Sequence, residues 1–507
     1  MVIYWHKQDF RLIDNQALNK AIKLSITNSL KFLPIFGLET DLINNPEIEF
    51  EFSKLHICAK ISAFLPLFEN YQYFGVQPVL FKNSVIETLE KINTNNKNNQ
   101  IKYLITHQEH GTTGTYQRDQ KVNNYCKQNN INWVQIPPSS VQRGIIDRDN
   151  RTKDFNNYVN SEVLLIPNFK NLDQSLQTFT DTYQIENQKL FKEFLQEKNR
   201  IIEKNNFQLK DTNEKSALEE LKSFTTYRSS HYRGSISSPN TALEFGSRLS
   251  QYLAYGSISL RFVYQYFWQT INNTTDKKIK SGLLATLSRL HWREHFIQRI
   301  ESEATMVDKS INLEFNNIEY SHKLELFEAF KKGMTGEVLV DACLRCLLQT
   351  GFINFRMRAM LLSYSVFGLD LDWRKTGRFL ASVFYDYEPG IHWSQIHMQA
   401  GITGINTIRV YSPSKQLLDQ DMDCKFVRQW IPELQDLTNE QILDYLNLSL
   451  AKLTNNQYID PIVNFKEQSK INKIKTFSLR KESNKGESKK VFVKHGSRRK
   501  NLEKNKN

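Results

Sequence analysis

The stretch VIYWHKQDFRLIDNQALNKAI runs from Val2 to Ile22 and joins two kinds of pattern. The four apolar residues VIYW are typical of a buried strand. The segment DNQALNKAI that follows has apolar residues at helical spacing. A strand that leads directly into a helix is the repeating unit of an α/β sheet, so this stretch predicts that the chain begins with an α/β fold.

The same alternation of strand and helix continues to about residue 140. Helical segments such as SVIETLEKI separate further short apolar runs. This spacing predicts a doubly wound parallel sheet, a fold that often binds nucleotide-like ligands at the carboxyl ends of its strands. The sequence has neither a GxGxxG motif nor a P-loop, so no ordinary dinucleotide site is indicated. The expected strands are 2–5, 32–38, 78–81, 103–106 and 133–136.

The pattern changes after residue 140. Residues 141–214 are rich in Asn, Gln and Lys with little periodicity, and we interpret them as a linker. Residues 215–450 contain amphipathic helical segments such as LRFVYQYFWQTI and few strand signals, which predicts a large all-α domain. Residues 451–507 are expected to form a basic, partly disordered tail. The predicted organisation is therefore an α/β domain (1–140), a linker, a helical domain and a tail.

The composition indicates a globular protein in a reducing compartment. The chain has 507 residues, 40% of them hydrophobic, and five cysteines, too few for a disulfide framework. No apolar run reaches the roughly eighteen residues that a membrane span needs. We therefore expect a cytoplasmic protein without a membrane segment. Cys343 and Cys346 form a CxxC without a second cysteine pair, and we interpret them as ordinary helix residues rather than metal ligands.

Most of the net charge of +13 lies at the end of the chain. From Lys466 onward there are fifteen Lys and Arg residues and four Asp and Glu residues. Such a tail could bind nucleic-acid phosphates through counterion release. It could equally be a solvated segment without a specific partner. Both interpretations of the tail stay open.

Several segments, in order along the chain, resemble the photolyase/cryptochrome family. WHKQDFRLIDNQAL (5–18) resembles the opening of that family, and SRLSQYLAYGSIS (247–259) its flavin-phosphate segment. GMTGEVLVDACLRCLLQTGF (333–352) is similar to one of its helices, and NTIRVYSP (406–413) and FVRQWIPEL (426–434) close the resemblance. It implies an N-terminal α/β domain, a helical domain that holds FAD, and light-driven DNA repair.

The resemblance places the FAD phosphates on a turn before a short helix. Backbone N–H groups and hydroxyls at the start of a helix suit an anion, and Arg248 adds positive charge. An ordinary serine N-cap is the alternative interpretation of this turn. The residues that would hold the phosphates are Tyr232, Gly246, Ser247, Arg248, Leu249 and Ser250.

The stretch VFYDYEPGIHWSQIHMQAG (383–401) resembles the loop that wraps the isoalloxazine ring. Asp386 falls on the acidic position of the family, and Arg358 on the arginine that pairs with it. A buried carboxylate needs such a partner, and a cation near the ring favours the anionic reduced flavin.

Three more residues of this loop are expected to contact the cofactor. Tyr387 and Glu388 follow the acidic position, and Glu388 would lie on the adenosine or ribose side. His392 takes the place beside flavin N5, where its side chain could donate, accept or titrate. A structural histidine with satisfied hydrogen bonds is the alternative for His392.

The usual electron chain of the family, three tryptophans, is interrupted. Trp373 matches the middle position, but Ile396 stands at the flavin-proximal position and Tyr320 at the distal one. An isoleucine cannot be oxidised at a useful potential, so the usual route is broken at its first step. Other aromatic residues could form another path or could simply pack in the core; they are Trp393, Tyr385, Tyr387 and Tyr364.

The lesion pocket also departs from the pattern of dimer photolyases. Trp292 is present, but Arg289 stands where they carry a glutamate, Phe355 replaces an asparagine and Met398 a second tryptophan. Trp292 and Phe355 could stack on a flipped base or could line an apolar flavin pocket. The histidines of the 6-4 branch are replaced by Asn354 and Ala359. The resemblance implies DNA contacts from Arg289, Trp292, Arg293, Arg356 and Met398, with Arg356 facing a phosphate.

The sequence therefore predicts a monomeric, FAD-dependent enzyme that splits cyclobutane pyrimidine dimers by electron transfer from excited reduced flavin. Its catalytic residues would be Trp373, Trp292 and His392. A second, antenna chromophore of the pterin, deazaflavin or flavin type is suggested by segments 107–122 and 140–151, although an empty cleft is the alternative. Two other functions stay open: a cryptochrome-like photoreceptor without repair activity, and a light-independent flavoprotein that binds nucleic acid.

Overall fold

The computed structural model describes residues 1–97, 99–144, 150–172, 177–405, 407–482, 490, 491 and 494, and these form two compact units. Unit 1 comprises Met1–Arg233, Ser247–Glu301 and Phe384–Pro389. Unit 2 comprises Gly234–Gly246, Ser302–Val383 and the described part of Gly390–Asn507. Each unit has its own buried side chains.

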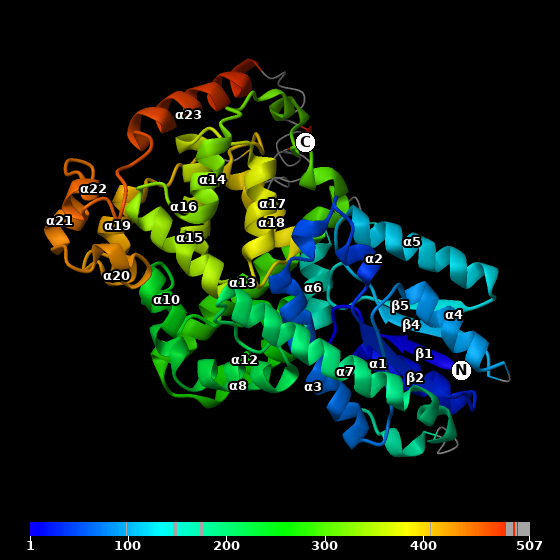
Figure 1. Cartoon of the computed structure of the whole chain (residues 1–507). Coiled ribbons are helices and arrows are strands. Elements are labelled where there is room, and N and C mark those ends of the chain that lie inside the picture. Colours follow the sequence, from blue (N-terminus) through cyan, green and yellow to red (C-terminus); the bar gives the residue numbers. More distant parts are fainter. Residues whose placement is uncertain are drawn as a thin grey trace, which may run out of the picture. The chain divides into compact units, whose positions relative to one another are not determined.

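Unit 1 is built around a five-stranded parallel sheet (Figure 1). The strand order is β3-β2-β1-β4-β5, and every pair of neighbours is parallel. The doubly wound parallel sheet predicted from the sequence is therefore confirmed. The strands are β1 (Val2–Trp5), β2 (Phe32–Gly37), β3 (Val79–Phe81), β4 (Tyr103–His107) and β5 (Asn132–Ile136).

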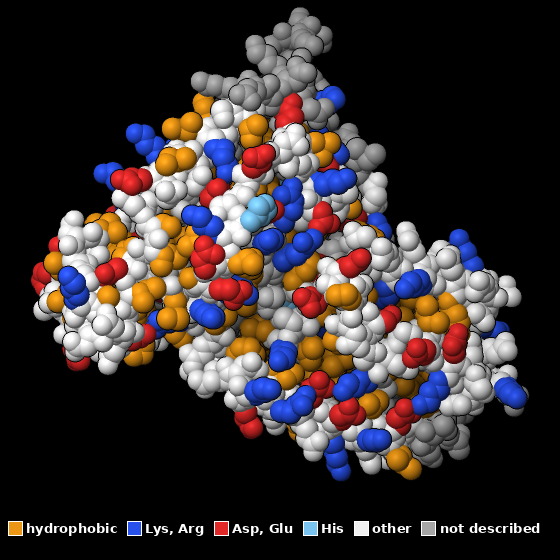
Figure 2. Space-filling model, turned by 45° about the horizontal axis from the view of Figure 1, so that its top comes forward, with side chains coloured by type: hydrophobic (Ala, Val, Ile, Leu, Met, Phe, Trp, Pro, Cys, Tyr) orange, Lys and Arg blue, Asp and Glu red, His pale blue; other side chains and the backbone are white. Residues whose placement is uncertain are grey.

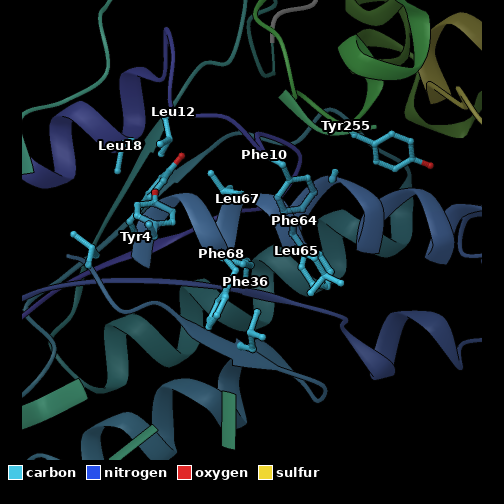
Figure 3. Close-up of a cluster of buried hydrophobic side chains, with 14 of the residues drawn as sticks. Tyr4, Phe10, Leu12, Leu18, Phe36, Phe64, Leu65, Leu67, Phe68 and Tyr255 are labelled. Atoms are coloured by element: carbon cyan, nitrogen blue, oxygen red, sulfur yellow. The ribbon is translucent and has the colours of Figure 1, made fainter. Parts of the chain in front are cut away.

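Helices cover this sheet, and one large apolar cluster lies between them and the strands (Figure 3). Tyr4 and Phe36 come from the sheet, Phe64 from α3, and Phe10 and Tyr255 from loops. The helices of unit 1 are α1 (Gln16–Thr27), α2 (Thr40–Ile43), α3 (Lys54–Tyr73), α4 (Val85–Asn95), α5 (Thr113–Gln128), α6 (Arg151–Val159), α7 (Gln177–Asn205), α8 (Glu214–Thr226), α11 (Ser250–Ala254), α12 (Leu260–Asn273) and α13 (Lys277–Ser302), whose last residue belongs to unit 2.

The interpretation of residues 141–214 as a linker was wrong, because much of this segment forms helices α6 and α7. In α7 the residues Tyr183, Asn187, Phe194 and Ile201 are buried at intervals of four or seven, which is one face of a helix. Abundant Asn, Gln and Lys between these positions hid the periodicity. The helices pack in unit 1, so the unit extends beyond the predicted limit at residue 140.

The described part of unit 2 contains helices and turns and no strand, which confirms the large helical part of the predicted fold. A short helix, α9 (Tyr232–Ser235), begins in unit 1 and ends in unit 2. The helices of unit 2 are α10 (Pro239–Phe245), α14 (Leu324–Lys332), α15 (Val338–Thr350), α16 (Phe355–Ser363), α17 (Trp373–Val383), α18 (Pro389–Gln399), α19 (Pro413–Gln420), α20 (Lys425–Trp430), α21 (Asn439–Leu443), α22 (Leu450–Leu453) and α23 (Phe465–Glu482).

The first part of the predicted tail is also ordered. Residues 450–453 and 465–482 form α22 and α23, and Asn472 of α23 donates to the Phe367 carbonyl at 3.0 Å. The ring of Phe465 stacks on Tyr364 with 5.7 Å between centroids. The remainder of the tail, apart from residues 490, 491 and 494, lies outside the described residues, as do Asn406 and residues 145–149 of the two family-like segments.

Candidate functional site

Unit 1 contains a cavity of about 140 Å³ near the carboxyl ends of its strands. Gln8 follows β1, Glu39 follows β2 and Gln108 follows β4, and all three side chains line the cavity. The carboxyl ends of neighbouring parallel strands meet at one edge of a sheet, where such folds commonly bind ligands. Residues 253–260, part of α13 and the loop 387–389 complete the wall.

Several buried polar atoms of the cavity wall have no hydrogen-bond partner within the described part of the chain. They are Gln8 Oε1, Glu39 Oε1, Gln108 Oε1 and His110 Nε2. The other ring nitrogen of His110, Nδ1, lies 2.6 Å from Glu301 Oε1. A buried polar atom without a partner costs about 1–3 kcal/mol. A ligand with polar edges would remove that cost, so the wall fits such a ligand.

Burial shifts the pKa of three carboxyl groups of the wall, Glu39, Glu51 and Glu388, towards the neutral form. Burial raises the pKa of Glu51 to about 8, although Thr112 at 2.7 Å and Tyr387 at 3.2 Å donate hydrogen bonds to it. Burial also raises the pKa of Glu388 to about 7, and the positive charge of Arg293, 2.9 Å away, opposes the shift. Near neutral pH this part of the wall therefore offers O–H donors as well as acceptors.

A buried ion-pair network fixes the acidic side of the wall. Arg118 donates to Glu39 at 3.0 Å and to Glu109 at 2.6 Å, and it also bonds Asp119. Lys7 donates to the same Asp119 at 2.8 Å. Three of these residues belong to segment 107–122, which the sequence related to an antenna site. The network leaves Arg118 and Lys7 bound to carboxylates rather than aimed at a ligand.

The predicted phosphate turn has an unusual backbone in unit 1. Arg248 has a φ of +54°, and Leu249, the N-cap of α11, returns to the right-handed region at φ −88° and ψ −8°. A left-handed residue followed by a right-handed one turns successive N–H groups to one side, which is an anion-binding concavity. The alternative of a serine N-cap is not what forms here, because the N-cap is Leu249. Ser250 is the first helical residue.

The neighbours of this turn fit a phosphate-bearing group. The side-chain amide nitrogen of Gln251 is buried next to the turn. Burial raises the pKa of Tyr232, with Arg289 opposing the shift, so the hydroxyl of Tyr232 stays a donor at neutral pH. Arg248 itself is paired with Glu220 at 2.9 Å. The residues of unit 1 on this turn therefore suit the diphosphate of FAD, and Gly246 adjoins them as the last residue of its segment of unit 2.

The residues expected beside the flavin ring are divided between the units. In unit 2, His392 Nε2 donates to the Gly377 carbonyl at 2.9 Å, which fixes the orientation of its ring. Arg358 donates to the Ile353 carbonyl at 2.8 Å and lies over the Phe352 ring. Asp386 is buried in unit 1. The pairing of Arg358 with Asp386 stays a prediction.

Unit 2 also holds a closed cluster of aromatic rings. Trp373, at the start of α17, and Trp393, on α18, are fully buried with 6.3 Å between ring centroids. His397 meets Trp373 edge-on at 4.8 Å. Its Nε2 donates to the Met306 carbonyl at 2.7 Å, and its Nδ1 accepts from the Ile311 N–H at 3.4 Å. This pattern fits a neutral histidine whose two nitrogens hold residues 306–311 in place.

The rings predicted for the lesion pocket are exposed. Trp292 is 43% exposed in unit 1 and packs on Phe296 of the same helix, while Phe355 is 54% exposed at the start of α16 in unit 2. Such exposure is compatible with stacking on an external base and with contact to a bound flavin. Asn354 is structural, because its amide donates to the carbonyls of Ile236 and Ser237.

The basic and sulphur-bearing residues predicted to contact DNA differ in their surroundings. Arg289 is exposed and Met398 is half-buried. Arg356 donates to Gln416 at 3.4 Å. Arg293 lines the cavity and is bound by Glu294 and Glu388, so its contacts point to the cavity rather than to DNA. On the face that Figure 2 draws, basic side chains are interspersed with acidic and apolar ones.

Sequence reasoning did not identify the acidic residues of the cavity. Glu39 stands two residues after β2 and Glu109 two residues after β4, and Glu51 lies farther along the chain. The first two could have been found, because polar residues directly after parallel strands mark the ligand-binding edge of a sheet. Nothing in the sequence around Glu51 indicates its place in the wall. Gly377, which the unit 2 cluster needs, was not singled out either.

The cysteine pair lies inside a helix of unit 2. Cys343 and Cys346 are buried on α15, and Cys346 Sγ contacts the Thr350 hydroxyl at 3.7 Å. Within the described residues there is no group of three or more His, Cys, Asp or Glu side chains suited to a metal ion. In the same part of the chain, no helix combines the length and the hydrophobicity that crossing a membrane requires.

Comparison with family models gives two matches. Residues 2–142 match the model of DNA photolyase, and residues 286–477 match the FAD binding domain of DNA photolyase. The first covers the sheet and helices α1 to α5. The second covers Trp292, the aromatic cluster and His392. The FAD-binding assignment therefore agrees with the cofactor predicted from the sequence.

Curated relatives include both kinds of protein that the sequence left open. A deoxyribodipyrimidine photo-lyase of Alkalihalophilus pseudofirmus is 27% identical over 48% of this chain and 50% of its own. A cryptochrome DASH of Danio rerio is 28% identical over 45% of each chain. The chain thus spans about half the length, or less, of these curated relatives. Proteins named photo-lyase and proteins named cryptochrome are both represented among them.

Solved structures resemble the whole chain in fold. A photolyase from Sulfolobus tokodaii, solved with two FAD molecules, is 22% identical with a TM-score of 0.70, and the match covers 94% of this chain and 99% of that one. A class III photolyase from Agrobacterium tumefaciens is 19% identical with a TM-score of 0.73, over 95% and 98% of the two chains. At these identities the likeness concerns the fold alone.

Proposed function

Because the chain belongs to the photolyase/cryptochrome family, we propose that it is an FAD-dependent enzyme that uses blue light to split cyclobutane pyrimidine dimers in DNA. The observation that carries this proposal is the exposure of Trp292, at a position where the resemblance expects a lesion-binding ring. A large ring that is 43% exposed on a long helix is more useful as a stacking surface for a base than as part of a core.

Bound FAD would supply the light-driven electron, and the residues of this chain would bind and orient it. The turn from Ser247 to Ser250 would hold its phosphates with backbone N–H groups, and Tyr232 would add a hydroxyl donor. His392 would present a ring that the Gly377 carbonyl holds in one orientation. Asp386 and Arg358 would complete the flavin surroundings.

The substrate proposed is a dimer flipped out of the DNA helix. Trp292 and Phe355 would stack on its bases, since an exposed aromatic ring accepts any base face. Arg289 and Arg356 would contact phosphates near the lesion. Arg289 replaces the glutamate expected in dimer photolyases, so lesion binding in this chain would rely more on stacking and less on a carboxylate.

The cavity of unit 1 is the proposed site of a second chromophore. Its position at the carboxyl ends of β1, β2 and β4 suits a heteroaromatic ligand. Its wall offers acceptors and neutral carboxyl groups that such a ligand could bond. The Sulfolobus tokodaii relative was solved with two FAD molecules, which supports a flavin as one of the candidate ligands. Pterin and deazaflavin are the others.

The test is a repair assay with the purified protein. Chemical reduction first puts the FAD into its reduced form, and blue light is then applied with an oligonucleotide that contains one thymine dimer. Repaired ends are counted against a dark control. Trp292→Ala should lose repair, whereas Trp268→Ala, which removes a ring that is 39% exposed on α12, should keep it. The absence of repair by reduced, FAD-loaded protein would overturn the proposal.

A second candidate function is a cryptochrome-like photoreceptor. The substitutions Arg289, Phe355 and Met398 in the lesion pocket favour it, as do the relatives named cryptochrome DASH. The repair assay separates the two candidates. A photoreceptor would show a light-dependent change of its flavin spectrum without loss of the dimer.

A further inference from the structure

The two buried tryptophans of unit 2 form a continuous ring contact that begins at His392. The ring of His392 meets Trp393 at 5.1 Å and 88°, and Trp393 meets Trp373 at 6.3 Å and 77°. All three side chains are buried and come from two neighbouring helices, α17 and α18. An indole pair of this kind can carry an electron between an acceptor beside His392 and a donor beyond Trp373.

The sequence alone does not show where the side chain of Trp393 lies relative to Ile396 and Trp373. It lies three residues before Ile396, so both side chains share one face of α18. A Cβ added at Gly377 would come within 2.6 Å of Trp393 Cζ3 and 3.6 Å of Ile396 Cγ1. Both side chains therefore lie over Gly377. The missing side chain of Gly377 makes the room for an indole beside a position that holds only an isoleucine.

The far end of the pair lies close to solvent. The guanidinium of Arg374 lies 4.7 Å from the centre of the Trp373 ring, and the Arg374 side chain is 21% exposed. Asp372 pairs with Arg374 at 3.2 Å, which offsets the effect of the positive charge on an oxidised indole. Trp373 is thus in contact with a side chain that reaches solvent.

The surroundings favour an indole over a phenol as the last carrier. Trp373 Nε1 and the Tyr320 hydroxyl are both buried without a hydrogen-bond partner among the described residues. An oxidised tryptophan can keep its proton as a radical cation. Tyrosine oxidation near neutral pH requires loss of the phenolic proton, for which Tyr320 has no acceptor there. The distal position of the family is therefore a poor relay in this chain.

We propose that Trp393 and Trp373, in that order, carry the electrons that reduce the cofactor, an inference that rests on the proposed function. Trp393 gives one electron to photoexcited oxidised FAD, and Trp373 then gives one electron to the Trp393 radical cation. An external thiol refills Trp373: it loses a proton to water and one electron, and two thiyl radicals pair as a disulfide. No bond of the protein forms or breaks, and protons taken up by the cofactor come from solvent.

The test is flash spectroscopy on the oxidised, FAD-loaded full chain. Transient absorption and electron paramagnetic resonance record the tryptophan radical, and steady blue light with added thiol records the extent of flavin reduction. Trp393→Phe and Trp373→Phe should each lose the thiol-dependent reduction. In Trp393→Phe the radical signal should also disappear. Trp430→Phe, which removes a buried indole of α20, is the matched control and should behave like the wild type.

A rescue variant separates an electron-transfer role from a packing role. Adding Ile396→Trp to Trp393→Phe returns an indole to the same face of α18 and should restore the radical. Tyr320→Phe should leave the radical and the reduction unchanged. A radical of wild-type yield in Trp393→Phe, or no radical in the wild type, would overturn the proposal. So would full reduction in both single variants.

Failure of this inference can be told apart from failure of the proposed function. Chemically reduced Trp393→Phe bypasses the indole pair, so it should repair a thymine dimer as well as the reduced wild type does. Equal repair with lost photoreduction supports both proposals. If the reduced wild type repairs nothing while its tryptophan radical forms as expected, the repair function fails and the electron route stands.

Discussion

The cavity of unit 1 and the aromatic cluster of unit 2 are built in opposite ways. The cavity has a volume of about 140 Å³ and is lined by carboxyl groups and by polar atoms without partners among the described residues. In the cluster, Trp373 and Trp393 are fully buried and a single added methyl group at Gly377 would collide with a ring. The first arrangement is incomplete without a bound molecule, whereas the second is complete in itself.

This difference indicates two separate tasks within one protein. A wall with unpaired acceptors is costly until a ligand bonds to it, so the cavity is suited to binding. A dry, close-packed set of rings gains nothing from a ligand and holds fixed distances, which is what electron transfer requires. Light absorption by a second chromophore and electron supply to FAD could therefore be altered independently.

The largest effect is expected where the cavity wall meets the sheet. Gly256 has a φ of +62°, and an added Cβ would lie 2.0 Å from the Gln8 carbonyl oxygen. Gly256→Ala should lower the free energy of unfolding by roughly 3 kcal/mol or more, measured by urea denaturation. Gly75→Ala is the control, because its φ is +76° but its Cβ would meet nothing within 4 Å. If the two variants lose the same free energy of unfolding, the backbone at Gln8 moves aside for the added methyl group.

The packing of the cluster should give the next largest effect. Gly377→Ala pushes a Cβ against the rigid Trp393 ring and should cost roughly 1–3 kcal/mol in thermal unfolding. Gly234→Ala, in α9, adds a Cβ to open space and should be neutral or slightly stabilising. If Gly377→Ala is as stable as the wild type, the rings have room to move and the cluster is not close-packed.

The carboxyl groups of the cavity should make stability depend on pH. The pKa of Glu51 is raised to about 8, so its contribution is complete below the ordinary value of 4.5 and is lost as pH rises through about 8. Between these limits the contribution of Glu51 to the unfolding free energy should fall by up to about 1.4 kcal/mol per pH unit, and Glu51→Gln should remove that share of the slope while Glu388, whose pKa is raised to about 7, keeps its own. Denaturant titrations at pH 5 to 9 measure it.

Glu109 provides a control of opposite sign. Burial alone would raise the pKa of Glu109, but the positive charges of Arg118 and Lys7 lower that pKa by a larger amount. The pKa of Glu109 therefore lies below its ordinary value. Its contribution is present above that ordinary value and is lost in acid. Glu109→Gln should therefore change stability at low pH and keep most of the slope from pH 5 to 8, because the charge of Glu109 is the smallest of the causes that shift the pKa of Glu51. A loss of that slope in Glu109→Gln would contradict the assignment to Glu51.

The smallest effect concerns two arginines of α13 that lie four residues apart. Arg289 is exposed, whereas Arg293 is held by Glu294 and Glu388 in the cavity wall. Arg289→Ala should weaken DNA binding and reduce the slope of log affinity against log salt by about 1. Arg293→Met should leave that slope unchanged. Titrations of labelled DNA at several salt concentrations would show whether Arg293 contacts phosphate after all.

The sequence predicted the sheet well because its signal is local. The run VIYW has the same bounds as β1, and short apolar runs separated by helices leave few other folds. Helix α7 was missed because its four described buried residues, Tyr183, Asn187, Phe194 and Ile201, lie among long stretches of polar ones. In α23 the inward face includes Asn472 and Thr476, so no apolar stripe indicated a packed helix.

The candidate site was predictable only in part. Family-like motifs pointed to the turn at Arg248, and the structure gives that turn a backbone suited to an anion. The contact between Trp373 and Trp393 depends on how α17 and α18 approach each other at Gly377, which no local pattern encodes. The bonds of Arg293 to Glu388 likewise join residues ninety-five positions apart.

The most direct measurement is the number of thymine dimers repaired per protein molecule in blue light, for the wild type and Trp393→Phe side by side. Each protein is assayed after chemical reduction, and again from the oxidised state with thiol. Both reduced proteins should repair equally, and from the oxidised state only the wild type should repair. No repair by the reduced, FAD-loaded wild type would show that the protein is not a dimer photolyase.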